Sequence, residues 1–146
     1  MKKLILILGA NGIGKTSVGK EILTRIKHIA FIDAEWCRAI NPFDFTNETK
    51  KTVENNIFCM IRNYLLCPDI NYVIFPYGFH KERKEIFDNI INKLNGEKIQ
   101  FKLCPVILTC DINKNIQRMK SDNRNEERIR RAIENTRDIY STSKYG

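Results

Sequence analysis

A glycine-rich segment near the start of the chain carries the clearest chemical signal. Residues 9–16 read Gly-Ala-Asn-Gly-Ile-Gly-Lys-Thr and match G-x-x-x-x-G-K-[ST] at every fixed position. Glycines let the backbone curl so that successive N–H groups point at one phosphate, and Lys15 adds a mobile positive charge for the β- and γ-phosphates. The spacing predicts a phosphate-binding loop (P-loop) for a nucleoside triphosphate, rather than a turn that merely joins a strand to a helix. The expected nucleotide-binding residues are Gly9, Ala10, Asn11, Gly12, Ile13, Gly14, Lys15, Thr16 and Ser17.

Two acids one residue apart form a second candidate group. Asp33 and Glu35 follow the apolar run Ile29–Ile32, which predicts a strand. Ligands of open parallel sheets bind outside the carboxyl ends of the strands, so these acids should face the P-loop. Phosphoryl transfer needs one carboxylate near the metal and another near the acceptor. Asp33 is therefore a candidate Mg²⁺ ligand together with the Thr16 hydroxyl, and Glu35 a candidate general base. The alternative is a solvated loop whose acid caps a turn.

The third candidate group lies in a basic segment late in the chain. The net charge is +8, and the segment Lys114–Arg137 holds eight basic and four acidic residues. A lid at about 114–128 would close over the triphosphate, and such a patch suits phosphates of a nucleotide or a nucleic acid. Arg124 is the candidate for neutralising charge during transfer, Arg118 for the base or ribose, and Arg128 for the acceptor. The alternative for each arginine is a surface ion pair.

Four further residues are candidates for contact with the acceptor. Trp36 and Tyr77 are expected to line an acceptor pocket, with the hydrophobic core as the alternative for large aromatic side chains. Arg38 would clamp an acidic acceptor. His80 follows the third predicted strand and would hydrogen-bond the acceptor or cap the next helix.

The elements that must position these residues alternate along the chain. Each apolar run is followed by a segment with helical spacing, and this order predicts a parallel sheet with helices on both faces. The expected fold is thus a three-layer α/β P-loop NTPase fold in a single domain, residues 1–146, without a fifth strand. The predicted strands are Leu4–Leu8, Ile29–Ile32, Tyr72–Phe75 and Val106–Cys110, the last of them beginning near Phe101.

The helical segments are predicted from apolar residues that recur three or four positions apart. One helix ends before Pro68 and another at Asn95–Gly96, while Asp111 would cap a short helix after the fourth strand. The apolar positions of these helices are Val18, Ile22, Leu23 and Ile26; Val53, Ile57, Met60, Ile61 and Leu65; Ile86, Ile90, Ile91 and Leu94; Ile112, Ile116 and Met119; and Ile129, Ile133 and Tyr140.

Composition limits the class of protein. No run of about 18 apolar residues exists to span a membrane. The five cysteines contain no C-x-x-C pair and only two histidines accompany them, so a zinc site is not expected. With no secretory signal, reduced thiols in a cytoplasmic protein are the simplest interpretation.

With these residues in place, the chain resembles the P-loop kinases that include shikimate, gluconate and nucleoside-monophosphate kinases. More narrowly, it is similar to small nucleotide-kinase-like proteins of Firmicutes that carry Asp-x-Asp-Trp-Cys followed by Asn-Pro-Phe. Here residues 33–37 read Asp-Ala-Glu-Trp-Cys and residues 41–43 read Asn-Pro-Phe. The resemblance covers most of the chain and implies ATP as phosphate donor, Mg²⁺ near Asp33, and acceptor contact or general base at Glu35.

Three departures from that pattern affect the expectations. Glu35 replaces an Asp, which lengthens the carboxylate arm by one methylene. Residues 73–77 contain no Walker B acid, which disfavours a motor-type ATPase. The relatives carry a fifth strand and a further helix, so the fourth strand here would be an exposed edge in a truncated form, or would be covered in a homodimer.

The sequence therefore leaves three functions in order. The first is a Mg-ATP-dependent kinase that moves the γ-phosphate to a small-molecule acceptor, either a nucleotide or a small alcohol. The second is a kinase for the 5′-hydroxyl end of a nucleic acid, motivated by Arg38 and the charge of +8. The third is a nucleotide-binding module without transferase activity.

Overall fold

The computed structural model describes residues 1–10, 12–109 and 117. Strands and helices alternate, as the sequence pattern predicts. The elements in chain order are β1 (Lys3–Leu8), α1 (Lys15–Arg25), β2 (Ile29–Phe31), the 3₁₀ helix η1 (Trp36–Arg38), α2 (Asn47–Leu66), β3 (Tyr72–Pro76), α3 (Glu82–Gly96) and β4 (Lys102–Ile107).

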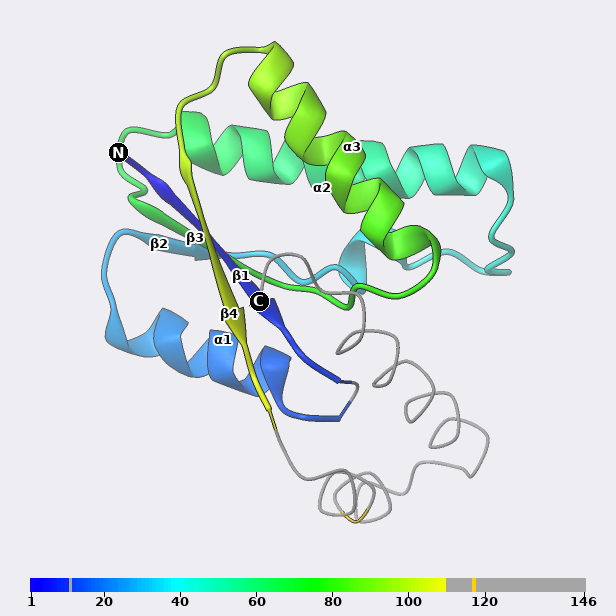
Figure 1. Cartoon of the computed structure of the whole chain (residues 1–146), viewed down its shortest axis with the longest axis horizontal. Helices are drawn as coiled ribbons and strands as arrows, with labels where there is room; N and C mark the ends of the chain where they lie inside the picture. Colours follow the sequence, from blue (N-terminus) through cyan, green and yellow to red (C-terminus); the bar gives the residue numbers. More distant parts are fainter. Residues whose placement is uncertain (11, 110–116, 118–146) are drawn as a thin grey trace.

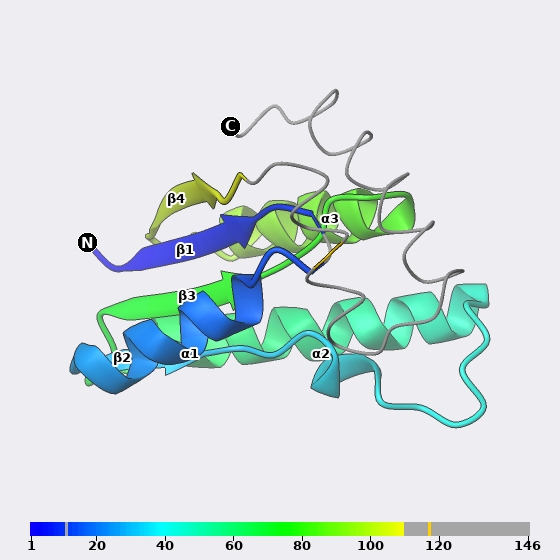
Figure 2. The same cartoon turned by 90° about the horizontal axis from the view of Figure 1, so that it is seen from below.

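These strands form one parallel sheet with the order β2-β3-β1-β4. The order can be followed in Figure 2, where β4, β1, β3 and β2 lie one after another. β1 is paired on both sides, with Ile5 opposite Ile74 of β3 and opposite Cys104 of β4. Because all the strands are parallel, the segments that leave β1, β2 and β3 emerge at the same edge of the sheet.

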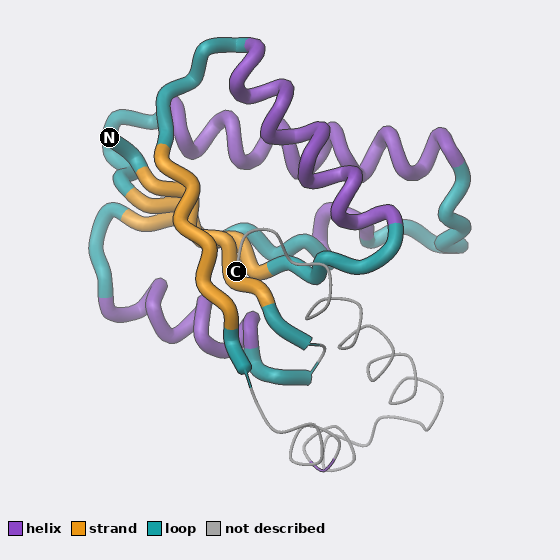
Figure 3. Tube along the Cα trace, viewed as in Figure 1, coloured by secondary structure: helices purple, strands orange, loops and turns teal. Residues whose placement is uncertain are grey.

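Helices cover both faces of the sheet, so the predicted three-layer α/β fold is confirmed. α1 lies on one face, while α2 and α3 pack together on the other (Figures 1 and 3). Between the sheet and the α2–α3 layer lies the larger core, because apolar residues of β1 and β3 meet apolar residues of both helices there. Fully buried members of this core include Leu4, Leu6, Leu8, Val73, Phe75, Ile57, Ile61, Phe87 and Ile90.

The apolar face predicted for α1 is wrong in part. Val18, Leu23 and Ile26 are 38%, 40% and 46% exposed, and the buried residue of the helix is Gly19. A Cβ at Gly19 would lie 2.6 Å from the Phe31 ring and 3.2 Å from Pro76. The helix approaches the sheet through its glycine, which brings its backbone close and leaves the larger side chains at the sides of the contact.

The fourth strand is displaced from the range Val106–Cys110 that its apolar run predicts. β4 begins at Lys102 and ends at Ile107, because its length is set by the pairing from Lys3–Lys102 to Leu8–Ile107 along β1. Within the described part of the chain β4 pairs with β1 alone, and Val106 is 44% exposed, as expected for an edge strand. Residues 110–116 and 118–146 lie outside the described residues, so the helices predicted there and the expected lack of a fifth strand remain predictions.

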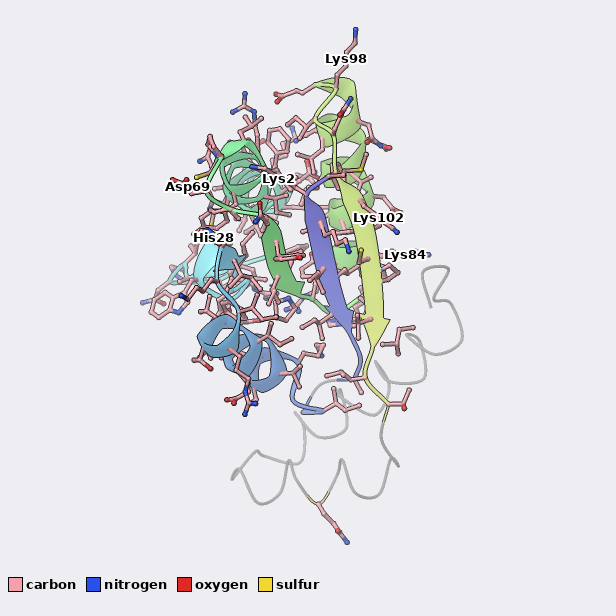
Figure 4. All side chains as sticks on the ribbon, turned by 90° about the vertical axis from the view of Figure 1, so that its left-hand side faces the viewer. Lys2, His28, Asp69, Lys84, Lys98 and Lys102 are labelled. Atoms are coloured by element: carbon pink, nitrogen blue, oxygen red, sulfur yellow. The ribbon has the colours of Figure 1, made fainter. Side chains whose placement is uncertain are left out.

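The amino ends of the strands form the opposite edge, where the turns are tied to one another. Figure 4 shows His28, Asp69 and Lys2 at this edge. The His28 ring lies 3.0 Å from the Asp69 carbonyl oxygen, and the His28 carbonyl accepts a 2.7 Å hydrogen bond from the Asn71 N–H. Lys2 donates to the Cys67 carbonyl. These contacts join the turn before β2 to the turn before β3.

In the part of the chain that the structure describes, no helix is both long enough and apolar enough to pass through a membrane.

The close contact at Gly19 generates a stability prediction with a matched control. Gly19→Ala places a methyl group against Phe31 and Pro76, so we expect a loss of about 1–3 kcal/mol of unfolding free energy. Gly96→Ala, at the end of α3, meets no atom within 4 Å and should be neutral or stabilise by about 0.4–1 kcal/mol. Urea unfolding of both variants measures the difference. Equal stability of the two variants would contradict the glycine-mediated contact.

Candidate functional site

The loop between β1 and α1 adopts the backbone that its glycines predict. Gly9, Gly12 and Gly14 have φ values of 149°, 81° and 101°, a region that side-chain-bearing residues rarely occupy. A Cβ at Gly9 would also lie 2.9 Å from the Leu108 carbonyl oxygen. The glycines are therefore needed both for the curl of the loop and for its close approach to the segment after β4. Asn11 lies outside the described residues.

Lys15 turns back over this loop. Its ammonium donates hydrogen bonds of 2.8 Å to the Gly9 carbonyl and 2.9 Å to the Ala10 carbonyl, and the side chain is half-buried. Because these acceptors are backbone oxygens at the mouth of the loop, the charge is held beside the space that the loop encloses. An incoming phosphate group would compete with the two carbonyls for the same ammonium.

The first turn of α1 is free of internal charge compensation. Gly14 is the N-cap in the left-handed conformation, no side chain caps the helix, and the first turn contains no acid. The first N–H groups of a helix have no intrahelical acceptor, and they carry the positive end of the helix dipole. Thr16 and Ser17 lie in this turn with exposed side chains. The arrangement suits an anion.

Asp33 and Glu35 lie at the same edge of the sheet, after β2. Asp33 Oδ1 accepts a 2.9 Å hydrogen bond from the Glu35 N–H and so stabilises the turn that leads into η1. Both alternatives for Asp33 thus remain open, because a capping carboxylate still has a second oxygen for a metal. Glu35 is exposed, and its Oε1 lies 3.7 Å from Arg83 Nη2.

A small pocket lies beside these acids, between the loop after β2, α2 and the first turn of α3. It has an empty volume of about 260 Å³, part of which is open to solvent. Apolar side chains form most of its walls and two arginines, Arg38 and Arg83, supply its charge. The lining residues are Ala34, Arg38, Phe45, Val53, Ile57, Tyr77, Arg83 and Ile86.

Arg38 and Tyr77 are therefore placed at a pocket, as the sequence predicts, whereas Trp36 is not. The Arg38 guanidinium lies 4.5 Å from the centre of the Phe43 ring, a cation–π geometry. Tyr77 is both a core residue, 5% exposed, and a pocket residue, and burial raises the pKa of its hydroxyl. Trp36 is 79% exposed and does not line the pocket, because η1 turns its side chain toward solvent.

Arg83 is a residue that sequence reasoning missed. It lies in a run of charged residues, His-Lys-Glu-Arg-Lys-Glu at 80–85, whose pattern is typical of a solvated helix face. In the structure its side chain is only 23% exposed, because the first turn of α3 folds against the segment after β3. The one available signal is its distance of three residues from His80, which is one helical turn.

His80 lies between the P-loop and the pocket. Its Nδ1 is buried and has no hydrogen-bond partner among the described residues, so the predicted capping role of its side chain is not observed. Burial lowers the pKa of His80 to about 4, and the cations Arg83, Lys15, Lys81 and Arg38 lower it further. The imidazole is therefore neutral near pH 7. Its position requires Gly78, where a Cβ would lie 3.1 Å from Nδ1.

The residues expected to hold Mg²⁺ fit a phosphate-dependent site better than a site built from protein ligands alone. No cluster of three or more His, Cys, Asp or Glu side chains occurs in residues 1–10, 12–109 and 117. Mg²⁺ is commonly held by one or two protein oxygens together with substrate phosphates and waters. Thr16 and Asp33 meet that requirement by type and by edge of the sheet. The predicted lid at 114–128, with Arg118, Arg124 and Arg128, lies outside the described residues.

Fold and loop together define a class: an α/β protein with the parallel sheet of a P-loop NTPase. No family model matches the chain, and no curated protein matches it. Among solved structures 48 chains match. One is a chain in the structure of the Pnkp1/Rnl/Hen1 complex, with a TM-score of 0.54 and 13% sequence identity over 80% of this chain. The match covers 38% of that chain, and at this identity it shows the fold alone.

The lowered pKa of His80 predicts a pH dependence of stability. As the pH falls below about 6.5 the unfolded chain gains a proton at His80, while the folded chain stays neutral there until about pH 4. The folded state should therefore lose stability between these values, by on the order of 1 kcal/mol after allowing for partial exposure of the ring. Urea unfolding at pH 7 and pH 5 measures the loss.

The control for this prediction uses both histidines. His80→Gln should reduce the loss of stability between pH 7 and pH 5, whereas His28→Gln, at the opposite edge of the sheet, should retain it. An unchanged loss in His80→Gln would show that the pKa of His80 is not lowered.

Proposed function

We propose that this protein is a Mg-ATP-dependent phosphotransferase that moves the γ-phosphate to a small-molecule acceptor. The observation that carries the proposal is the loop at residues 9–16, where three glycines with positive φ lead into an uncapped helix and Lys15 lies over the loop. These are the parts that bind a triphosphate in P-loop proteins. The acids after β2 and the pocket beside them lie at the same edge and supply an acceptor side.

In the proposed mechanism, catalysis comes from positioning and charge neutralisation rather than from covalent chemistry. The loop N–H groups and Lys15 bind the phosphates, and Thr16 and Asp33 would hold Mg²⁺, which neutralises charge on the phosphate oxygens when bound. Glu35 would accept the proton of the acceptor hydroxyl. Arg124 would neutralise charge on the transferred group.

Two contacts complete the proposed site at its ends. Arg118 would contact the base or ribose of the nucleotide, and Arg38, His80 and Arg128 would contact the acceptor. The pocket favours a small acceptor, because its empty volume is about 260 Å³ and its walls are mainly apolar.

A nucleic-acid 5′ end is the second candidate acceptor, favoured by the net charge of +8. Binding to a nucleic acid should weaken steeply as salt increases, because bound counterions are released. A weak salt dependence of acceptor binding would exclude it in favour of a small acceptor.

The first test is ADP release with Mg-ATP across nucleoside monophosphates, small hydroxy acids and alcohols, and 5′-hydroxyl oligonucleotides. We expect stimulation by a small acceptor, and a loss of at least about 100-fold in Lys15→Ala, because the charge on the transferring phosphate is no longer neutralised. Lys20→Ala, on the exposed side of the same helix, is the matched control and should retain activity. Binding of Mg-ATP without turnover for every acceptor would instead identify a non-catalytic nucleotide-binding module.

A further inference from the structure

The two arginines of the pocket are enclosed in an unusual way for charged side chains. Arg83 is 23% exposed, and its Nη2 lies 3.7 Å from Glu35 Oε1, which is beyond hydrogen-bond distance. No hydrogen bond to the Arg83 guanidinium occurs among the described residues. Buried charges in proteins are normally paired and hydrogen-bonded, since desolvation is costly otherwise. The donors of Arg83 therefore lack the oxygen acceptors that such a group requires.

Arg38 adds a second positive charge to the same pocket. Its guanidinium stacks over the Phe43 ring, and no ion pair with an acid joins it within the part of the chain that the structure describes. Burial lowers the pKa of Arg83, and Arg38 lowers it further, while Glu35 opposes the shift. The two guanidinium groups are therefore close enough to repel each other, and one loosely held carboxylate is the acid that offsets them.

The positive field extends from this pocket to the P-loop. Arg38, Arg83, Lys15 and Lys81 all lower the pKa of His80, and no acid raises it. His80 thus reports that the cations of the pocket and the lysine of the phosphate loop surround one region. An anion bound at the two arginines would lie beside the P-loop, rather than on a remote surface.

We infer that Arg83 and Arg38 form a binding site for an anionic group, a phosphate or a carboxylate, and that the acceptor of the proposed kinase carries this group. The planar guanidinium groups match both anions in geometry. The anion would take the place of Glu35 at Arg83 and leave the Glu35 carboxylate free for the acceptor hydroxyl. Ile57, Val53 and Ile86 would contact the uncharged part of the molecule. The anion site stands on the pocket, whereas the acceptor's identity rests on the proposed function.

The binding test needs no phosphate transfer. Trp36 is the single tryptophan of the chain and lies two residues before Arg38, so its fluorescence reports on the pocket. Titrations with phenyl phosphate, benzoate and benzyl alcohol compare two anions with an uncharged molecule of the same ring. They are made in a Lys15→Ala background, which weakens anion binding at the P-loop. We expect saturable binding of one or both anions and weaker binding of benzyl alcohol.

Variants with opposite expected signs keep the test independent of folding. Arg83→Gln should weaken anion binding about tenfold or more, because a charge-assisted contact is lost. Arg25→Gln, which removes the same charge from an exposed position on α1, should leave it unchanged. Glu35→Gln should strengthen anion binding several-fold by removing the competing carboxylate, an effect that an unfolded protein cannot show. Equal anion affinity in Arg83→Gln and the parent, or no gain in Glu35→Gln, would overturn the site.

Transfer assays then separate this inference from the proposed function. Nucleoside monophosphates and hydroxy acids distinguish a phosphate from a carboxylate as the recognised group, with the matching nucleosides and alcohols as uncharged controls. Arg83-dependent anion binding without transfer to any acceptor supports the site and rejects the kinase. Transfer that is equally fast with charged and uncharged acceptors, and unaffected by Arg83→Gln, supports the kinase and rejects the site.

Discussion

The pairing of β1 with β3 on one side and β4 on the other is the constraint on which the candidate site depends. This pairing places the strand that precedes the phosphate loop in the interior of the sheet, with Leu4, Leu6 and Leu8 fully buried. A strand held along both edges has little freedom to shift its register. The end of β1 therefore fixes where the loop begins, and the parallel direction of β2 and β3 brings Asp33, Glu35 and His80 to the same edge.

The contact between α1 and the sheet extends this constraint to the phosphate loop. Since Gly19 lets the helix backbone approach Phe31 and Pro76, the start of α1 is held close above the carboxyl edge. An uncapped helix end with no acid in its first turn gains from a bound anion. Packing at one turn of the helix thus positions the electrostatic feature at its first turn.

Charge is distributed unevenly over this edge. Lys15, Arg38 and Arg83 come from three different segments, and their closeness is felt at His80, whose pKa is lowered to about 4. Like charges gathered at a partly dry edge destabilise one another, and the cost falls when an anion binds between them. The site therefore has the electrostatics of a protein that binds more than one anionic group, one at the loop and one at the pocket.

Sequence alone determined the features that depend on local chemistry. The glycine spacing at residues 9–16 predicts a loop that only glycine can form, and period and turn residues predict the described strands and helices, because these signals act within a few positions of the chain. Tertiary structure decided the rest. The limits of β4 follow from its pairing with β1, the buried position on α1 follows from the fit of Gly19 against Phe31, and Arg83 is drawn into the pocket by packing of α3. Burial and charge proximity are properties of segments far apart in the chain, so a charged run that resembles a solvated helix face becomes part of a candidate binding site only once the sheet has brought its neighbours together.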